Sequence, residues 1–249
     1  MLKVSNLCVQ RGSVDVLNGV SFNLAEGEFL SLIGPSGCGK STLLAALTGD
    51  LVAASGAIEL SGGATDGQVG SLAWMPQTDS LLPWLNTLEN TTLGLEIAGV
   101  GRKDAIEQVL PLIEPFGLAG FEQAWPHQLS GGMRQRVALL RTVALGRSVL
   151  LLDEPFGALD ALTRARMQEW LGAMQQQFGW TVLLITHDVR EAVVLSDRVL
   201  ALTPRPAEIA AEITINLPRP RASSLIATPR CGEFELQLLK ALEEASKPC

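Results

Sequence analysis

The feature that most constrains the fold is a glycine-rich octapeptide near the amino end, Gly34-Pro35-Ser36-Gly37-Cys38-Gly39-Lys40-Ser41. A short apolar run at residues 28–33 precedes it and predicts a buried strand, and a Leu- and Ala-rich stretch at 40–51 predicts a helix that stops near Gly49. A strand that passes through a tight glycine loop directly into a helix is typical of parallel α/β units. The sequence therefore predicts an α/β fold on a largely parallel sheet covered on both faces.

Strand and helix patterns alternate again later in the chain. The opening stretch, residues 1–24, differs, because turns such as Asn18-Gly19 interrupt its β character in the manner of antiparallel strands. Further strands are predicted by the short runs at residues 56–60, 70–75, 149–152, 181–186 and 198–203.

The stretch from about residue 81 to 145 is mostly helical and is broken by several prolines, so it predicts an insertion into the α/β core. A non-helical connector at 217–221 precedes a last helix at about 233–246. We expect a single domain over residues 1–249, with an N-terminal antiparallel β part, an α/β core at 1–80 and 146–222, a helical insertion at 81–145 and a helical tail at 223–249.

Composition excludes several classes of protein. The chain is 47% hydrophobic and 18% charged, as globular proteins are, and its longest apolar runs are too short to span a bilayer. The formal charge of −7 argues against a nucleic-acid partner. The first residues do not resemble a secretory signal, and the scattered cysteines predict free thiols in a reducing compartment. The cysteines are Cys8, Cys38, Cys231 and Cys249.

The octapeptide fits the pattern G-x-x-x-x-G-K-[ST], which cradles phosphates. Glycines let backbone N–H groups turn toward phosphate oxygens, and the start of the helix favours negative charge. Lys40 would then reach the β- and γ-phosphates, Ser41 would ligate Mg²⁺, and Thr42 would donate from the same turn. A chance glycine turn is the alternative, and the flanking strand and helix disfavour it.

Asp153 and Glu154 follow the apolar run 149–152, at the expected carboxyl end of a buried strand. Asp153 would hold Mg²⁺, and Glu154 would orient or deprotonate an attacking water. The pair could otherwise be an acidic cap of the next helix. A second glycine loop, Ser130-Gly131-Gly132, opens another helix and predicts a second anion site, for which one nucleotide bound within one subunit has little use.

In combination these motifs resemble the ABC ATPases over nearly the whole chain. Residues 129–136 look like the ABC signature motif, and Gln77 resembles the Q-loop glutamine. Asp160, in Ala158-Leu159-Asp160, resembles the D-loop, and His187, in Thr186-His187-Asp188, resembles the switch histidine.

The resemblance implies a homodimer that sandwiches two ATP molecules, each between the loop 34–42 of one subunit and Ser130-Gly131-Gly132 of the other. It also implies that Gln77 ligates Mg²⁺ and relays γ-phosphate occupancy to the helical insertion, that Asp160 belongs to the nucleotide site, and that His187 contacts the γ-phosphate. The implied partners are transmembrane permease subunits and, indirectly, a solute-binding protein. The implied location is cytoplasmic, on the inner face of a bacterial membrane.

Three segments, residues 81–90, 153–164 and 217–221, are similar to bacterial ATPases that power uptake of nitrate, aliphatic sulfonates, taurine and pyrimidine precursors. Related importers share parts of each segment, so another small-solute branch stays open. A non-transport ABC ATPase is the other alternative, but sustained heptads and a second phosphate loop are both lacking.

Some positions carry separate expectations. The family usually stacks an aromatic residue, often Tyr, on adenine, but this chain has no Tyr, and Arg11 occupies the matching position. Arg11 either stacks on the base or is a solvated turn residue. Alkylation of Cys38 is expected to block nucleotide binding, and His127 is expected to be structural or solvent-facing. The cluster Leu81, Leu82, Trp84 and Leu85 is either core or part of a groove for the membrane partner.

Overall fold

The computed structural model of the chain describes residues 1–60, 72–219, 221 and 228–245. Its main sheet has the strand order β5-β6-β7-β3-β8-β9. The first five of these strands are parallel to one another, and β9 is antiparallel to β8. The strands are β3 (Phe29–Ile33), β5 (Leu72–Met75), β6 (Val149–Asp153), β7 (Thr181–Thr186), β8 (Arg198–Leu202) and β9 (Ile209–Thr214).

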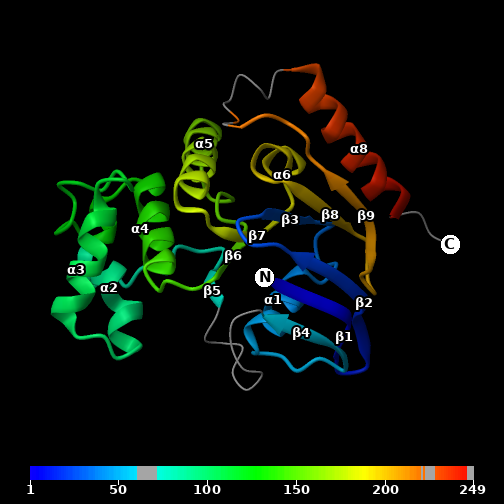
Figure 1. Cartoon of the computed structure of the whole chain (residues 1–249), viewed down its shortest axis with the longest axis horizontal. Coiled ribbons are helices and arrows are strands. Elements are labelled where there is room, and N and C mark those ends of the chain that lie inside the picture. Colours follow the sequence, from blue (N-terminus) through cyan, green and yellow to red (C-terminus); the bar gives the residue numbers. More distant parts are fainter. Residues whose placement is uncertain (61–71, 220, 222–227, 246–249) are drawn as a thin grey trace.

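A smaller antiparallel sheet, of order β2-β1-β4, covers one side of the main sheet (Figure 1). Side chains that point to this side of the main sheet, such as Leu30 and Leu32 of β3, share a buried core with helix α1 and the small sheet. Burial on both sides explains why the central strands are apolar throughout. The elements are β1 (Leu2–Arg11), β2 (Val14–Leu24), β4 (Ser55–Leu60) and α1 (Lys40–Thr48).

Helices cover the opposite face. Phe29 of β3 faces a second core shared with the helical insertion, and Ile33 faces a third core shared with the last helix. Figure 1 shows α2, α3 and α4 as one group beside the sheets. The helices are α2 (Thr87–Ile97), α3 (Arg102–Ile113), the 3₁₀ turn η2 (Pro126–Gln128), α4 (Gly131–Val143), α5 (Ala161–Phe178), α6 (Val189–Leu195) and α8 (Pro229–Ala245).

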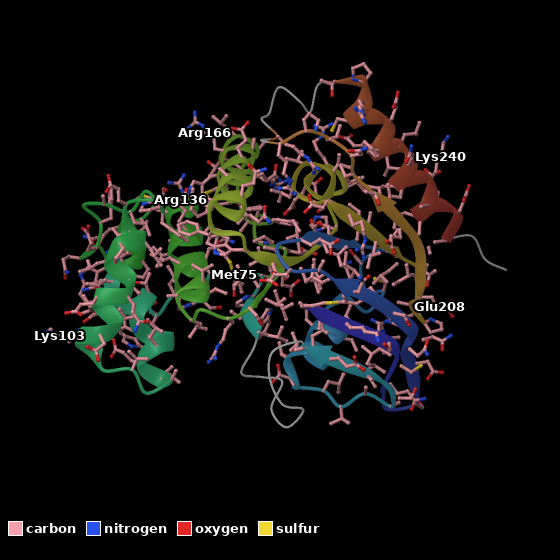
Figure 2. All side chains as sticks on the ribbon, viewed as in Figure 1. Met75, Lys103, Arg136, Arg166, Glu208 and Lys240 are labelled. Atoms are coloured by element: carbon pink, nitrogen blue, oxygen red, sulfur yellow. The ribbon has the colours of Figure 1, made fainter. Side chains whose placement is uncertain are left out.

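Helix α4 is the element that ties the helical group to the core. The Arg134 guanidinium forms an ion pair with Asp79 at 3.1 Å, and Arg141 donates to the backbone carbonyls of Asp79 and Ser80 at 2.7 and 2.8 Å. On its other side Arg136, which is labelled in Figure 2, lies 5.2 Å from the centre of the Trp170 ring in α5. The segment just after β5 is therefore fastened to α4.

The α/β fold and its antiparallel and helical parts are confirmed, with local differences. Helix α1 ends at Thr48, and Gly49, near which the sequence predicts its end, takes the left-handed conformation that terminates it. Strand β9 was not predicted, and the last helix begins four residues earlier than expected, at Pro229. Residues 70–71 of the strand predicted at 70–75, and Pro220 of the connector, lie outside the described residues. No helix in the described part is long and apolar enough to cross a membrane.

A buried carboxyl group lies in the first turn of α6. Glu191 is 4% exposed and accepts a hydrogen bond from the Thr186 hydroxyl at 2.9 Å. Its pKa is raised from 4.5 to about 8, chiefly by burial and also by the nearby Asp188, while Thr186 and Arg164 act in the opposite direction. The folded state therefore binds this proton more tightly than the unfolded state does.

We predict that Glu191→Gln makes the stability of the protein less sensitive to pH. Because the folded-state pKa of Glu191 is raised, the stability that its bound proton contributes is fully present below pH 4.5. That contribution is lost as the pH rises toward 8. The free energy of unfolding of the wild type, relative to the Gln variant, should fall by about 1–3 kcal/mol between pH 6 and 9 in urea titrations. Glu243→Gln, at an exposed position of α8, should leave the profile unchanged. Parallel profiles for the wild type and Glu191→Gln would contradict the prediction.

Candidate functional site

The glycine loop leaves β3 and turns back over the start of α1. The Lys40 ammonium donates to the carbonyls of Gly34 and Pro35 at 2.8 and 3.0 Å, and its side chain is largely buried. The N-cap residue is Gly39, so no side chain caps the first turn of α1. Backbone N–H groups without an intrahelical partner, next to a lysine, form a site for a multiply charged anion.

Gly39 is required by space as well as by conformation. Its φ is +133°, and a Cβ atom there would lie 2.9 Å from Leu17 Cδ2 and 3.0 Å from Val16 Cγ1. A larger residue would push the loop away from β2. The close contact holds the loop against the small sheet, so the residues present fit a phosphate cradle.

Strand β6 ends at Asp153, beside the cradle. Burial, and then the neighbouring Glu154, raise the pKa of Asp153 to about 6, while Lys40 lowers it. A divalent cation would favour the ionised form of this carboxyl group. Ser41, Gln77 and Asp153 offer the oxygen atoms that Mg²⁺ prefers, so the donor types fit that ion.

Glu154 is held from two sides. Gln77 Nε2 donates to Oε2 of Glu154 at 3.0 Å, and His187 Nδ1 lies 3.1 Å from Oε1. The Glu154 backbone N–H donates to Ile185 at 2.8 Å, and its φ of +45° is uncommon for a residue with a side chain. Such backbone strain is found most often at functional sites. The structure thus brings together three residues from the carboxyl ends of three strands.

The second glycine loop is built as the sequence predicts, at the start of α4. Ser130 is the N-cap and accepts from the Met133 N–H at 3.2 Å. Asp160 has the same role for α5 and accepts from the Thr163 N–H at 3.0 Å. Hydrogen bonds from the side chain and the backbone of Thr163 lower the pKa of Asp160. Among the described residues, neither Ser130 nor Asp160 lines the cavity beside Lys40.

That cavity has a volume of about 280 Å³. Two exposed arginines line it, Arg11 from the end of β1 and Arg205 from the turn between β8 and β9. Arg11 was singled out from the sequence, but Arg205 was not, although it follows a predicted strand at the edge where ligands gather. The remaining lining residues are Ser36, Gly37, Gly39, Lys40, Ser41, Thr42 and Glu154.

Three separate expectations can be compared with the structure. The Cys38 thiol is 2% exposed and lies in the core against the small sheet, so it offers little surface to an alkylating reagent, and the effect of its alkylation on nucleotide binding stays a prediction. His127 is exposed in η2, as expected. Of the apolar cluster, Leu81 packs on the core, whereas Trp84 is 65% exposed.

Comparisons with known proteins agree with this geometry. Residues 17–157 match the protein-family model described as ABC transporter. An uncharacterised ABC transporter ATP-binding protein from Methanocaldococcus jannaschii is 43% identical over 243 residues, which cover 96% of this chain and 91% of that relative. The taurine import ATP-binding protein of Yersinia pestis biovar Antiqua is 41% identical over 216 residues, covering 87% of this chain and 85% of that relative.

A solved structure gives the same result. It is described as a dimeric post-hydrolysis state of an ATP-binding cassette with ADP and Pi, and it matches with a TM-score of 0.72 at 28% identity. The match covers 87% of this chain and 100% of that one. Family model, relatives and fold lead to one conclusion: the chain belongs to the ABC transporter family, as an ATP-binding subunit with ATPase activity.

Proposed function

We propose that this chain powers a membrane importer of a small solute of the nitrate, sulfonate or taurine type. The main observation that supports its role in ATP hydrolysis is the position of the Glu154 carboxylate. Gln77 and His187 hold this carboxylate at the edge of the cavity that Lys40 lines. The similarity to taurine import proteins supports the solute class.

Each residue of the site has a proposed task in hydrolysis. Lys40 and the backbone N–H groups of residues 34–42 hold the phosphates, and they stabilise the charge that develops during transfer. Ser41, Gln77 and Asp153 hold Mg²⁺, which neutralises phosphate charge when it is bound. Glu154 orients the attacking water and accepts its proton, while His187 positions the carboxylate and the γ-phosphate.

The second anion loop is proposed to act on a neighbouring subunit. Ser130, Gly131 and Gly132 begin a helix whose N-terminus is suited to phosphate, yet they do not line the Lys40 cavity among the residues described. In a head-to-tail dimer each ATP would be held by the cradle of one subunit and by this loop, with Asp160, of the other. The site is then complete only in the dimer.

The proposed assembly continues to the membrane. Residues 81–145 would move as a unit on the α/β core and contact transmembrane permease subunits at the inner, cytoplasmic face. A solute-binding protein would act indirectly, through the permease. The Asn90 side chain, fully buried, fixes the turn that carries exposed Trp84 by bonding to the backbone of Leu82 and Leu85 at 2.8–3.1 Å. An exposed tryptophan on a turn whose backbone is held in this way is typical of an interface.

We predict that Glu154→Gln still binds ATP but accumulates as a closed dimer. The amide cannot accept the proton of water, so turnover should fall by roughly 10²–10⁴-fold. ATP affinity is measured by calorimetry, dimer content by size-exclusion chromatography and turnover by phosphate release. Glu107→Gln, an exposed change in α3, is the control. Normal turnover in Glu154→Gln would show that another group is the base.

We predict that two inactive variants restore activity when mixed. Lys40→Ala damages the cradle and Ser130→Arg blocks the second loop, so each homodimer lacks both complete sites. A mixed dimer keeps one complete site, and random pairing should return about a quarter of wild-type sites. Phosphate release is measured for each variant alone and for the mixture. A mixture that stays as inactive as its parts would refute the composite site.

We predict that Trp84→Ala loses assembly with the permease while the isolated subunit folds and binds ATP normally. Removal of an exposed anchor side chain weakens an interface by about 2 kcal/mol or more but affects folding little. Copurification with the permease and the thermal midpoint are the two measurements. Ile97→Ala, also exposed, serves as the matched change. Full assembly with Trp84→Ala would remove Trp84 from the interface.

A further inference from the structure

The turn between β8 and β9 brings a cation to the nucleotide cavity. Arg205 Nε donates to the Gly37 carbonyl at 2.6 Å, and its Nη2 would lie 3.7 Å from a Cβ atom at Gly37. The guanidinium therefore lies against the glycine loop, and it lines the same cavity as Lys40.

This turn is fixed to the small sheet on its other side. The Ala207 N–H donates to Val16 at 2.9 Å, and the carbonyl of Ala207 accepts from the Asn18 N–H, also at 2.9 Å. The Asn18 side chain donates to Glu208 at 2.6 Å, and Glu208 is labelled at this end of β9 in Figure 2. Because backbone bonds hold the turn, little freedom remains to be lost when Arg205 contacts a ligand.

The surroundings of Arg205 and Arg11 are alike in two respects. Neither forms an ion pair with a carboxylate of the described residues. No aromatic side chain lines the cavity in the part of the chain that the structure describes, and the whole sequence has no Tyr. A guanidinium offers a planar face for stacking on a heteroaromatic ring and N–H donors at its edge.

We propose that Arg205 contacts the base and ribose of the nucleotide and, with Arg11, forms the base-binding wall of the site. This inference rests on the proposed function, since it assumes that the cradle holds the phosphates. Lys40 and the loop amides bind the triphosphate, and the two guanidinium groups bind the remainder of the molecule. Arg205 then adds affinity for a nucleoside triphosphate but none for a triphosphate without a nucleoside.

The test compares ATP with inorganic tripolyphosphate, both with Mg²⁺, by isothermal titration calorimetry. Arg205→Ala should weaken ATP binding roughly 3- to 10-fold and leave tripolyphosphate binding unchanged. Unchanged ATP affinity would overturn the proposal. An equal loss for both ligands would overturn it too, because Arg205 would then act on the phosphates or on the shape of the loop.

Further variants separate the possible causes. Arg205→Lys keeps the charge and can donate to Gly37 but has no planar face, so it should lose ATP affinity as the Ala variant does. Wild-type affinity in Arg205→Lys would overturn the stacking wall. Lys40→Ala should weaken the binding of both ATP and tripolyphosphate. If it changes neither affinity, the cradle and the proposed function fail. If Lys40→Ala weakens both and Arg205→Ala neither, only the present inference fails. Arg230→Ala, exposed on α8, should match the wild type.

Discussion

The alignment of five parallel strands at one edge of the main sheet is the constraint on which the candidate site depends. Neighbouring strands in register share a direction, so their carboxyl ends meet. Strand β3 lies between β7 and β8, and Ile33 pairs with Thr186 on one side and Ala201 on the other. The register thus brings the glycine loop next to His187 and to the turn of Arg205. Groups more than a hundred residues apart meet without any long loop to carry them.

Local patterns were enough to predict this frame. The apolar stretches at 149–152 and 181–186 are buried on both faces, and a continuous apolar run is what such strands require. The glycine loop was also predictable, because few sequences other than this glycine spacing let successive backbone N–H groups turn toward a phosphate. Ser130, expected in a loop that opens a helix, is the N-cap of α4, and Asp160 is the N-cap of α5; serine and aspartate are preferred at that position.

Other features depend on contacts that one strand or loop does not specify. Strand β9 alternates half-buried and exposed positions and is stabilised by pairing with β8 and by packing against the last helix. The contact of Arg205 with Gly37 follows from that pairing, so no local pattern predicts it. The burial of Cys38 follows from the course of the loop, which turns the thiol toward Gly34 and away from the cavity. The two hydrogen-bonding partners of Glu154 also required the assembled sheet.

The fastening of α4 to Asp79 and Ser80 has a mechanical consequence. Arg134 and Arg141 hold the segment that follows Gln77, and the same helix begins with Ser130. A displacement of Gln77 would therefore reach α4 through these contacts. In the proposed dimer the N-terminus of α4 contacts the triphosphate held by the neighbouring subunit. The position of α4 in one subunit would therefore depend on whether the ATP in the other subunit's cradle has been hydrolysed. The two ATP sites would then be coupled through α4 itself, without a separate regulatory element.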